Sequence, residues 1–281
     1  MRMRKLSKTY LGVFLAFLYA PIMILILFSF NESKGRTFTG FTTKWYTQLF
    51  TDAAVLDALF TTLVVAFVAS IVATIMGTAA AIGLNKMEGR SKAVLMNMTY
   101  LPIVNPEIIV GVSFMLLFVV VKNLLATVGI PFSFGWITLI IAHITFNVPY
   151  VILSVLPKLR QMDGALVDAA MDLGCSHWQA FTKVVIHEIK PGIITGFLMS
   201  LTFSVDDFVV SYFTTGAKHQ TLSVLIYSMT KKRISPEINA ISTIIFIVVL
   251  VILIIVNITE RRSLEKQKKA REYRLREGGT F

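Results

Sequence analysis

Residues 157–190 read PKLRQMDGALVDAAMDLGCSHWQAFTKVVIHEIK and form the one long polar segment between apolar runs of membrane-spanning length. At its centre lies Asp168-Ala169-Ala170, followed after three residues by Gly174. A membrane protein that keeps a polar segment of this length on one side of the bilayer is expected to bind a partner there. The segment therefore indicates a helical protein with several membrane spans and a docking loop between two of them.

The composition of the 281-residue chain also indicates a membrane protein, because 55% of its residues are hydrophobic and only 15% are charged. Soluble domains carry about 25% charged residues. The apolar residues gather in runs of about 20 residues, the length that crosses a hydrocarbon core of about 30 Å. We therefore expect an all-α fold with six transmembrane helices. The predicted spans are Tyr10–Phe30, Phe60–Leu84, Thr99–Val121, Trp136–Leu156, Gly192–Phe213 and Asn239–Ile258.

Several other classes of protein and site are disfavoured. The single Cys175 cannot form an intrachain disulfide, and the four histidines lack metal-ligand spacing, so no metal site is expected. The first apolar run is too long for a signal peptide and lacks a small-residue cleavage site, which predicts a retained helix. The chain has no phosphate-binding G-x4-G-K-[ST] motif, so we do not expect it to hydrolyse ATP or to be an enzyme.

Basic residues set the predicted orientation. With the N-terminus in the cytoplasm, 19 of the 27 Lys and Arg lie on the cytoplasmic side, which the positive-inside rule favours for both termini. The predicted organisation is a cytoplasmic tail at 1–9, a transmembrane domain at 10–258 and a basic cytoplasmic tail at 259–281. The outer loop 214–238 departs from the rule, because it carries four basic residues. Within it, Leu222, Leu225 and Met229 have helical spacing, which fits a helix on the outer surface or one packed into the outer mouth.

The polar segment is predicted to be two helices joined at an elbow. Asp163 can cap the first helix, over 166–173, and Gly174 can end it with a positive φ. The second helix is expected to start at Ser176 and to stop at Pro191. An elbow of this kind is either a docking element or a surface hairpin without a partner.

This elbow resembles the "EAA" loop of binding-protein-dependent ABC permeases, whose pattern is E-A-A-x3-G-x9-I-x-L-P. Here the pattern reads Asp168-Ala169-Ala170-x3-Gly174-x9-Val184-x-Ile186, with His187 in place of the final proline. Further segments are similar to spermidine/putrescine permeases of the PotC type, in one order from about residue 28 to 258. They are FTTKWY at 41–46, HITF at 143–146, VDDFVVS at 205–211, IYSM at 226–229 and SPE at 235–237.

The resemblance implies a type I ABC importer permease fold and half of a polyamine translocation pore in the bacterial inner membrane. It implies three kinds of partner: a second, PotB-like permease, a PotA-like ATPase dimer and a PotD-like extracytoplasmic polyamine-binding protein. ATP and Mg²⁺ would bind the ATPase, and no cofactor is expected in this chain. The ATPase would move the coupling loop through Asp168, Ala169, Ala170, Asp172, Leu173 and Gly174.

The residues of the spans give an independent indication of a cation path. Of the sixteen Asp and Glu, only Glu107, Asp206 and Asp207 lie inside predicted spans, and no Lys or Arg lies well inside one. An ionised carboxylate in lipid costs at least about 2.5–3.5 kcal/mol on insertion scales, so retained acids indicate function. Phe203 and Tyr212 could add cation–π contacts. If helical, Asp206 and Asp207 would point about 100° apart.

Structural roles remain open for each of these residues. The acids could bond to neighbouring helices, and His143 and Asn147, one helical turn apart, could form interhelical hydrogen bonds or contact substrate. The small residues of Phe60–Leu84 favour a buried helix. Three other functions are also weighed: an ABC permease for another small solute, an ion-coupled secondary carrier and a membrane scaffold without a pore. The elbow argues against the carrier, and the acids argue against the scaffold.

Overall fold

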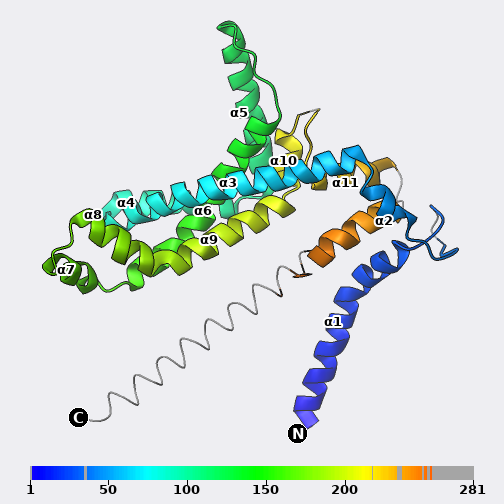
Figure 1. Cartoon of the computed structure of the whole chain (residues 1–281), viewed down its shortest axis with the longest axis horizontal. Helices are drawn as coiled ribbons and strands as arrows, with labels where there is room; N and C mark the ends of the chain where they lie inside the picture. The colour runs from blue at the N-terminus through cyan, green and yellow to red at the C-terminus, as the bar shows by residue number, and fades with distance from the viewer. Residues whose placement is uncertain are drawn as a thin grey trace. The chain divides into compact units, whose positions relative to one another are not determined.

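The structure is a computed structural model that describes residues 2–34, 37–216, 218–232, 236–248, 250–251 and 254, without the side chains of 2–8 and 232. The chain divides into two compact units. Unit 1 comprises Met1–Asp52 and Met229–Phe281, and unit 2 comprises Ala53–Ser228. The elements of the described residues are helices, apart from one isolated β-bridge between Asn31 and Phe41, and this confirms the predicted all-α class (Figure 1).

Among the described residues, five helices are long and apolar enough to cross a membrane: Thr9–Phe28, Ala53–Lys86, Glu107–Thr127, Trp136–Gln161 and His177–Asp206. They confirm a protein with several spans. The sixth predicted span, Asn239–Ile258, coincides in part with a shorter apolar helix, Pro236–Val248. The rest of that span, apart from a few positions, and the predicted tail 259–281 lie outside the described residues.

Unit 1 begins with α1 (Arg2–Phe28), whose spanning part, from Thr9 onward, has no buried residue in the chain itself. The loop after α1 folds around the buried side chain of Asn31. Its amide donates to the carbonyls of Ser33 and Thr37, and its Oδ1 accepts from the Thr39 N–H. Trp45, in α2 (Lys44–Leu49), donates its indole N–H to the Asn31 carbonyl at 2.7 Å. These bonds fix the loop as a small ordered structure.

The core of unit 2 is a bundle of α3 (Ala53–Lys86), α6 (Trp136–Gln161) and α9 (Ile186–Asp206), which pack against one another (Figure 1). Small residues allow the close approach. Val151 of α6 fits between Gly77 of α3 and Gly196 of α9, and a Cβ on either glycine would lie 3.2 Å or less from Val151. The prediction that α3 is a buried helix is confirmed by its fully buried Ala66, Ala69 and Ala73.

The predicted span Thr99–Val121 is wrong, because the chain breaks within it. The helix α4 (Gly89–Val104) ends before Asn105, whose backbone is extended with φ −72° and ψ 142°. Pro106 disfavours the helical conformation at the residue before it, which accounts for the break. The crossing helix is α5 (Glu107–Thr127), and Glu107 is therefore its first residue.

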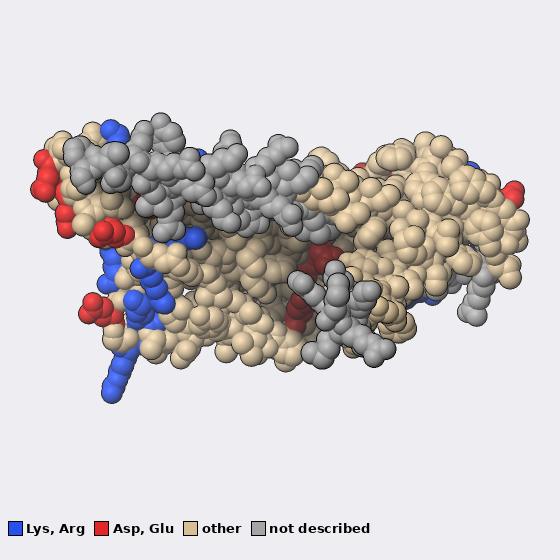
Figure 2. All heavy atoms as spheres, turned by 90° about the horizontal axis from the view of Figure 1, so that it is seen from below, with Lys and Arg blue, Asp and Glu red and all other residues tan. Residues whose placement is uncertain are grey.

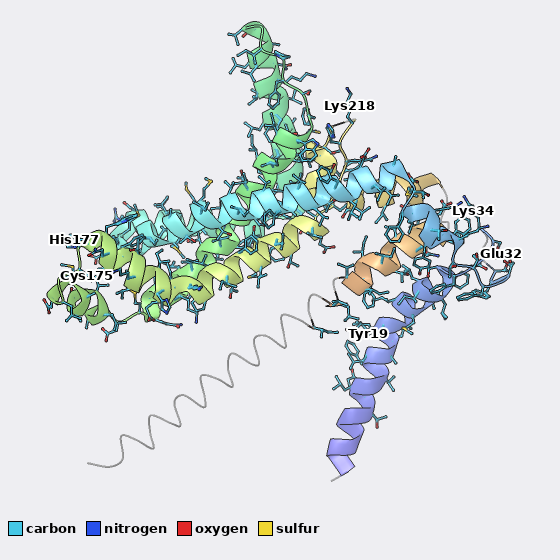
Figure 3. All side chains as sticks on the ribbon, viewed as in Figure 1. Tyr19, Glu32, Lys34, Cys175, His177 and Lys218 are labelled. Atoms are coloured by element: carbon cyan, nitrogen blue, oxygen red, sulfur yellow. The ribbon has the colours of Figure 1, made fainter. Side chains whose placement is uncertain are left out.

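The elbow has the predicted first helix, α7 (Ala165–Asp172), followed by Gly174 at φ +86°. Ser176 and Gln179 then form a capping box at the start of α8 (His177–Ala180). Cys175 and His177 mark this turn in Figure 3. The predicted stop at Pro191 is wrong, since α8, the π-helical turn η1 (Phe181–Val185) and α9 run on as one helix to Asp206. A proline removes only one N–H from a helix, and the tight packing of Gly192 on Ser154 and Lys158 holds this segment in place.

The predicted span Gly192–Phe213 is likewise broken, between α9 and α10 (Val209–Thr214). The helix α5 packs on α10. The outer-loop helix is α11 (Leu222–Lys232), and Leu222 and Leu225 are buried, so this part of the helix is packed against the unit. The Leu222 N–H donates to Thr62 of α3 at 2.8 Å. Lys218 lies in the loop between α10 and α11 (Figure 3).

Candidate functional site

A cavity of about 200 Å³ opens in unit 2 where α9 breaks. Residues of α4, α5, α6, α9 and α10 surround it, with those of the break between α9 and α10. Its lining consists of three carboxylates, four aromatic rings and four apolar residues. They are Glu107, Asp206 and Asp207; Phe146, Tyr150, Phe203 and Phe208; and Pro102, Val110, Val209 and Val210.

The three carboxylates that the sequence singles out therefore meet around one cavity. Each lies at a helix end: Glu107 begins α5, Asp206 ends α9, and Asp207 follows in the break. The expectation that Asp206 and Asp207 point about 100° apart on one helix is wrong. Asp207 has an extended backbone, with ψ 126°, because its side chain bonds to the next helix instead.

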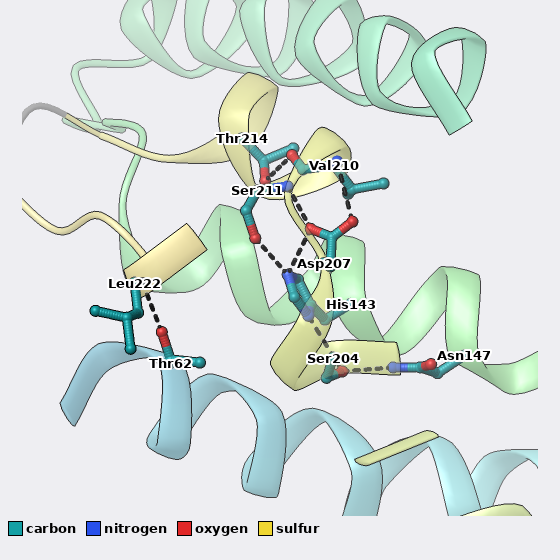
Figure 4. Close-up of polar contacts among 9 residues, drawn as sticks. All are labelled: Thr62, His143, Asn147, Ser204, Asp207, Val210, Ser211, Thr214 and Leu222. Atoms are coloured by element: carbon teal, nitrogen blue, oxygen red, sulfur yellow. Dashed lines mark hydrogen bonds and ion pairs between the residues drawn. The ribbon is translucent and has the colours of Figure 1, made fainter. Parts of the chain in front are cut away.

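Asp207 acts as a side-chain cap for α10. Its Oδ1 accepts the Val210 N–H at 3.2 Å and its Oδ2 accepts the Ser211 N–H at 2.6 Å (Figure 4). An aspartate that accepts these first N–H groups stabilises the start of a helix. The bonds also satisfy backbone donors that the break would otherwise leave unpaired inside the protein. The Asp207 side chain is only 7% exposed, yet it forms part of the cavity wall.

Behind Asp207 lies a buried polar network centred on His143 of α6. The His143 Nδ1 is 3.1 Å from Ser204 Oγ of α9, and its Nε2 is 3.1 Å from Ser211 Oγ of α10. The Nε2 also lies 3.6 Å from Asp207 Oδ2. Asn147 donates to the same Ser204 hydroxyl at 2.7 Å. The interhelical alternative for His143 and Asn147 is therefore the one that the structure shows, and neither residue is part of the cavity lining.

The aromatic residues extend from the cavity in two groups. Tyr150 and Phe203 lie 4.5 Å apart between ring centroids, on its wall. Phe208 lines the cavity as well and contacts Tyr227 and Tyr212, at 4.6 and 5.6 Å. Of the two predicted aromatic companions, Phe203 lines the cavity, whereas Tyr212 contacts Phe208 and is not part of the lining.

Three aromatic residues of the lining were not predicted: Phe146, Tyr150 and Phe208. A signal for them exists in the sequence, since Phe146 and Tyr150 are four residues apart and share a helix face with His143. Phe208 directly follows the two aspartates. These positions could be identified only once α6 and α9 were known to be neighbours.

The electrostatic character of the cavity is acidic, because the described residues that line it include three carboxylates and no Lys or Arg. In Figure 2, most of the visible Lys and Arg side chains gather at the left end of the view. Acids retained in a membrane-spanning region at this energetic cost indicate a path for cations.

The elbow forms a second candidate site. Its apolar side chains are unusually exposed, with Leu173 at 87% and Trp178 at 71%. The predicted coupling residues Asp168, Ala169 and Asp172 are exposed as well, and Gly174 supplies the turn. An exposed apolar surface at the tip of a rigid element is typical of a protein-binding site.

The chain belongs to the family of binding-protein-dependent transport system inner membrane components, whose model matches residues 73–265. It is thus a multi-pass membrane permease of the ABC importer class. It is 35% identical to the spermidine/putrescine transport system permease protein PotC of Haemophilus influenzae, over 86% of this chain and 91% of the relative. It is 37% identical to the putrescine transport system permease protein PotI of Escherichia coli K12, over 82% of this chain and 81% of the relative.

Solved structures support the fold. A chain of a bacterial ABC transporter that imports the acidic polysaccharide alginate matches with a TM-score of 0.71 at 20% identity, covering 92% of this chain and 95% of that one. The same transporter has been solved in complex with an alginate-bound periplasmic protein, and a chain of it matches with a TM-score of 0.70. These likenesses bear on the fold alone.

Proposed function

We propose that this permease imports polyamines, spermidine and/or putrescine, as one half of a heterodimeric pore. The observation that carries the proposal is the cavity in which three carboxylates and four aromatic rings face one space without a basic residue. A polyamine is a methylene chain with ammonium groups. Carboxylates pair with the ammonium groups, and aromatic faces attract them through cation–π contacts while they pack against the methylenes. The names of the PotC and PotI relatives point to the same class of substrate.

The chain's partners are proposed on the same basis. A PotB-like permease would complete the pore, a PotA-like ATPase dimer would hold ATP and Mg²⁺, and a PotD-like protein would deliver the polyamine from outside. The proposed orientation has both termini in the cytoplasm, which the distribution of basic residues favours. The elbow, with its exposed Leu173 and Trp178, would then face the ATPase.

The continuous helix offers a direct mechanical route from the ATPase to the cavity. The segment His177–Asp206 begins at the elbow and ends at the cavity carboxylate, a length of about 45 Å at 1.5 Å per residue. A displacement of the elbow would therefore be transmitted along this helix to Asp206. The break after Asp206 separates this helix from α10, so the outer part of the unit could stay in place while α9 moves.

Reconstitution of the four kinds of protein into proteoliposomes tests the proposal. Uptake of labelled spermidine is expected to require ATP, to persist when ion gradients are dissipated, to fall with excess unlabelled putrescine and to be unaffected by sulfate. Uptake driven by an ion gradient without ATP would establish a secondary carrier instead. An assembled complex that hydrolyses ATP and moves no polyamine would point to another solute.

A further inference from the structure

The imidazole of His143 links the two helices on either side of the break. It contacts Ser204 of α9 through Nδ1 and Ser211 of α10 through Nε2 (Figure 4). The residue is completely buried and is not part of the cavity lining. Any effect of His143 on a substrate must therefore pass through a neighbour that lines the cavity. Phe146 is one, at 5.2 Å between ring centroids, and Asp207, 3.6 Å from Nε2, is the charged one.

The surrounding groups favour one of the two ring nitrogens as the site of the proton. Asn147 donates an amide hydrogen to Ser204 Oγ, so the Ser204 hydroxyl hydrogen is free to point at His143 Nδ1. A neutral imidazole that accepts at Nδ1 carries its hydrogen at Nε2. This N–H then faces Ser211 Oγ and Asp207 Oδ2, the two groups nearest to it. The order of donation thus runs from Asn147 through Ser204 and His143 toward the carboxylate.

The opposite order would place an unprotonated Nε2 against the Asp207 carboxylate, two acceptors facing one another. The direction set by Asn147 avoids this repulsion. It also turns the Nε2–H toward Asp207 Oδ2, at 3.6 Å, while the N–H groups of Val210 and Ser211 form the hydrogen bonds to this carboxylate. At this distance the contact is electrostatic, and inside the protein such contacts are stronger than in water, so the orientation of the imidazole matters for where this carboxylate sits.

We infer that His143 is a positioning residue, oriented by Asn147 and Ser204, that holds the Asp207 carboxylate in the cavity wall where it receives an ammonium group of the substrate. This inference rests on the proposed function, because it assigns a role within the same cation path. It differs from a purely structural role, in which the imidazole would only tie α9 to α10.

Two conservative variants separate these roles. In His143→Gln, the side-chain amide reaches the position of Nε2 and can still point an N–H toward Asp207. In His143→Asn, the amide reaches only the position of Nδ1 and keeps the Ser204 contact. Each variant loses one of the two serine contacts, so a purely structural role predicts equal changes in KM for the two variants. A positioning role predicts that the Asn variant raises KM more than the Gln variant.

The experiment measures spermidine uptake by proteoliposomes with the complete complex and fits KM and kcat separately. His143→Asn is expected to raise KM about tenfold, the upper end of what one polar contact contributes, with kcat much less affected. His143→Gln is expected to stay within about threefold of wild type by the same scale. In an Asp207→Asn background the two variants should become equivalent, since the group through which His143 acts is changed. Thr78→Val, a buried and nearly isosteric change in α3, is the control and should leave KM unchanged.

Equal KM values for the Gln and Asn variants, or a difference that persists in the Asp207→Asn background, would overturn the inference. Failure of the proposed function has a different signature, namely no spermidine uptake by wild type. In that case the two His143 variants, with and without Asp207→Asn, are compared by the thermal midpoint of the purified complex. The Asn variant should lower the midpoint more than the Gln variant, and only when Asp207 is present; additivity with Asp207→Asn would again overturn the inference.

Discussion

Two glycines of the same helix give a sharp test of the packing of unit 2. In Gly77→Ala, the new Cβ would lie 2.6 Å from Val151 Cβ and 2.8 Å from Val151 Cγ1. Carbon atoms pack at about 3.5–4.0 Å, so α3 and α6 would have to separate by roughly 1 Å. Val151 cannot retreat, because Gly196 of α9 lies against its other side. Overpacking of this kind costs about 1–3 kcal/mol.

Gly83→Ala is the matched control, six residues along α3. A Cβ there meets nothing within 4 Å. Both substitutions gain the same preference of alanine over glycine in a helix, up to about 1 kcal/mol, so this gain cancels in the comparison. The two variants should therefore differ by about 1–3 kcal/mol in stability, with Gly77→Ala the less stable.

The thermal midpoint of the purified complex, followed by size-exclusion chromatography of heated samples, measures this difference. About 2–4 °C per kcal/mol applies to chains of this size, so a gap of roughly 6 °C is expected. Equal midpoints, or a higher midpoint for Gly77→Ala, would refute the close packing of α3 on Val151.

Three further predictions concern the loops. Gly174→Ala should cost about 1–2 kcal/mol at the elbow because of its φ of +86°, and hydrogen exchange of α7 should rise, whereas Gly164→Ala, at φ −59°, should leave exchange unchanged. Trp45→Phe should lower stability by about 1–3 kcal/mol, because the Asn31 carbonyl loses its buried donor, and an unchanged thermal midpoint would contradict a stabilising role for this hydrogen bond. Leu173→Ser should weaken ATPase binding in pull-down assays with the fold intact, since the side chain is 87% exposed, and wild-type binding would exclude it from the interface.

The membrane class and most of the spans could be predicted from the sequence because apolar runs of spanning length carry a strong signal. Hydropathy does not register the helix breaks inside those runs. Pro106 predicts the first break, and the structure confirms it at Asn105. The second break, at Asp207, depends on a side chain that bonds to the following helix, and aspartate is a residue favoured at helix starts.

The helix end predicted at Pro191 was wrong because a proline is present there and the helix nevertheless continues. A proline is a weak signal where neighbouring helices hold the segment, as α6 does here at Gly192. The candidate site was predictable in its acids, because charge inside a span is rare and conspicuous. Its aromatic wall was less so, since Phe146 and Tyr150 resemble ordinary apolar residues until α6 is placed beside α9.

The central claim, a carboxylate-lined cation path driven by ATP, is tested most directly by uptake of labelled spermidine into proteoliposomes with the complete complex, in wild type, Asp206→Asn and Asp57→Asn. Asp206 lines the cavity, whereas Asp57 is an exposed acid of α3 outside it. The account predicts ATP-dependent uptake in wild type and in Asp57→Asn, and an initial rate lower by about tenfold at limiting spermidine in Asp206→Asn, with assembly retained. Equal rates in all three proteins, or no uptake by a wild-type complex that hydrolyses ATP, would contradict it.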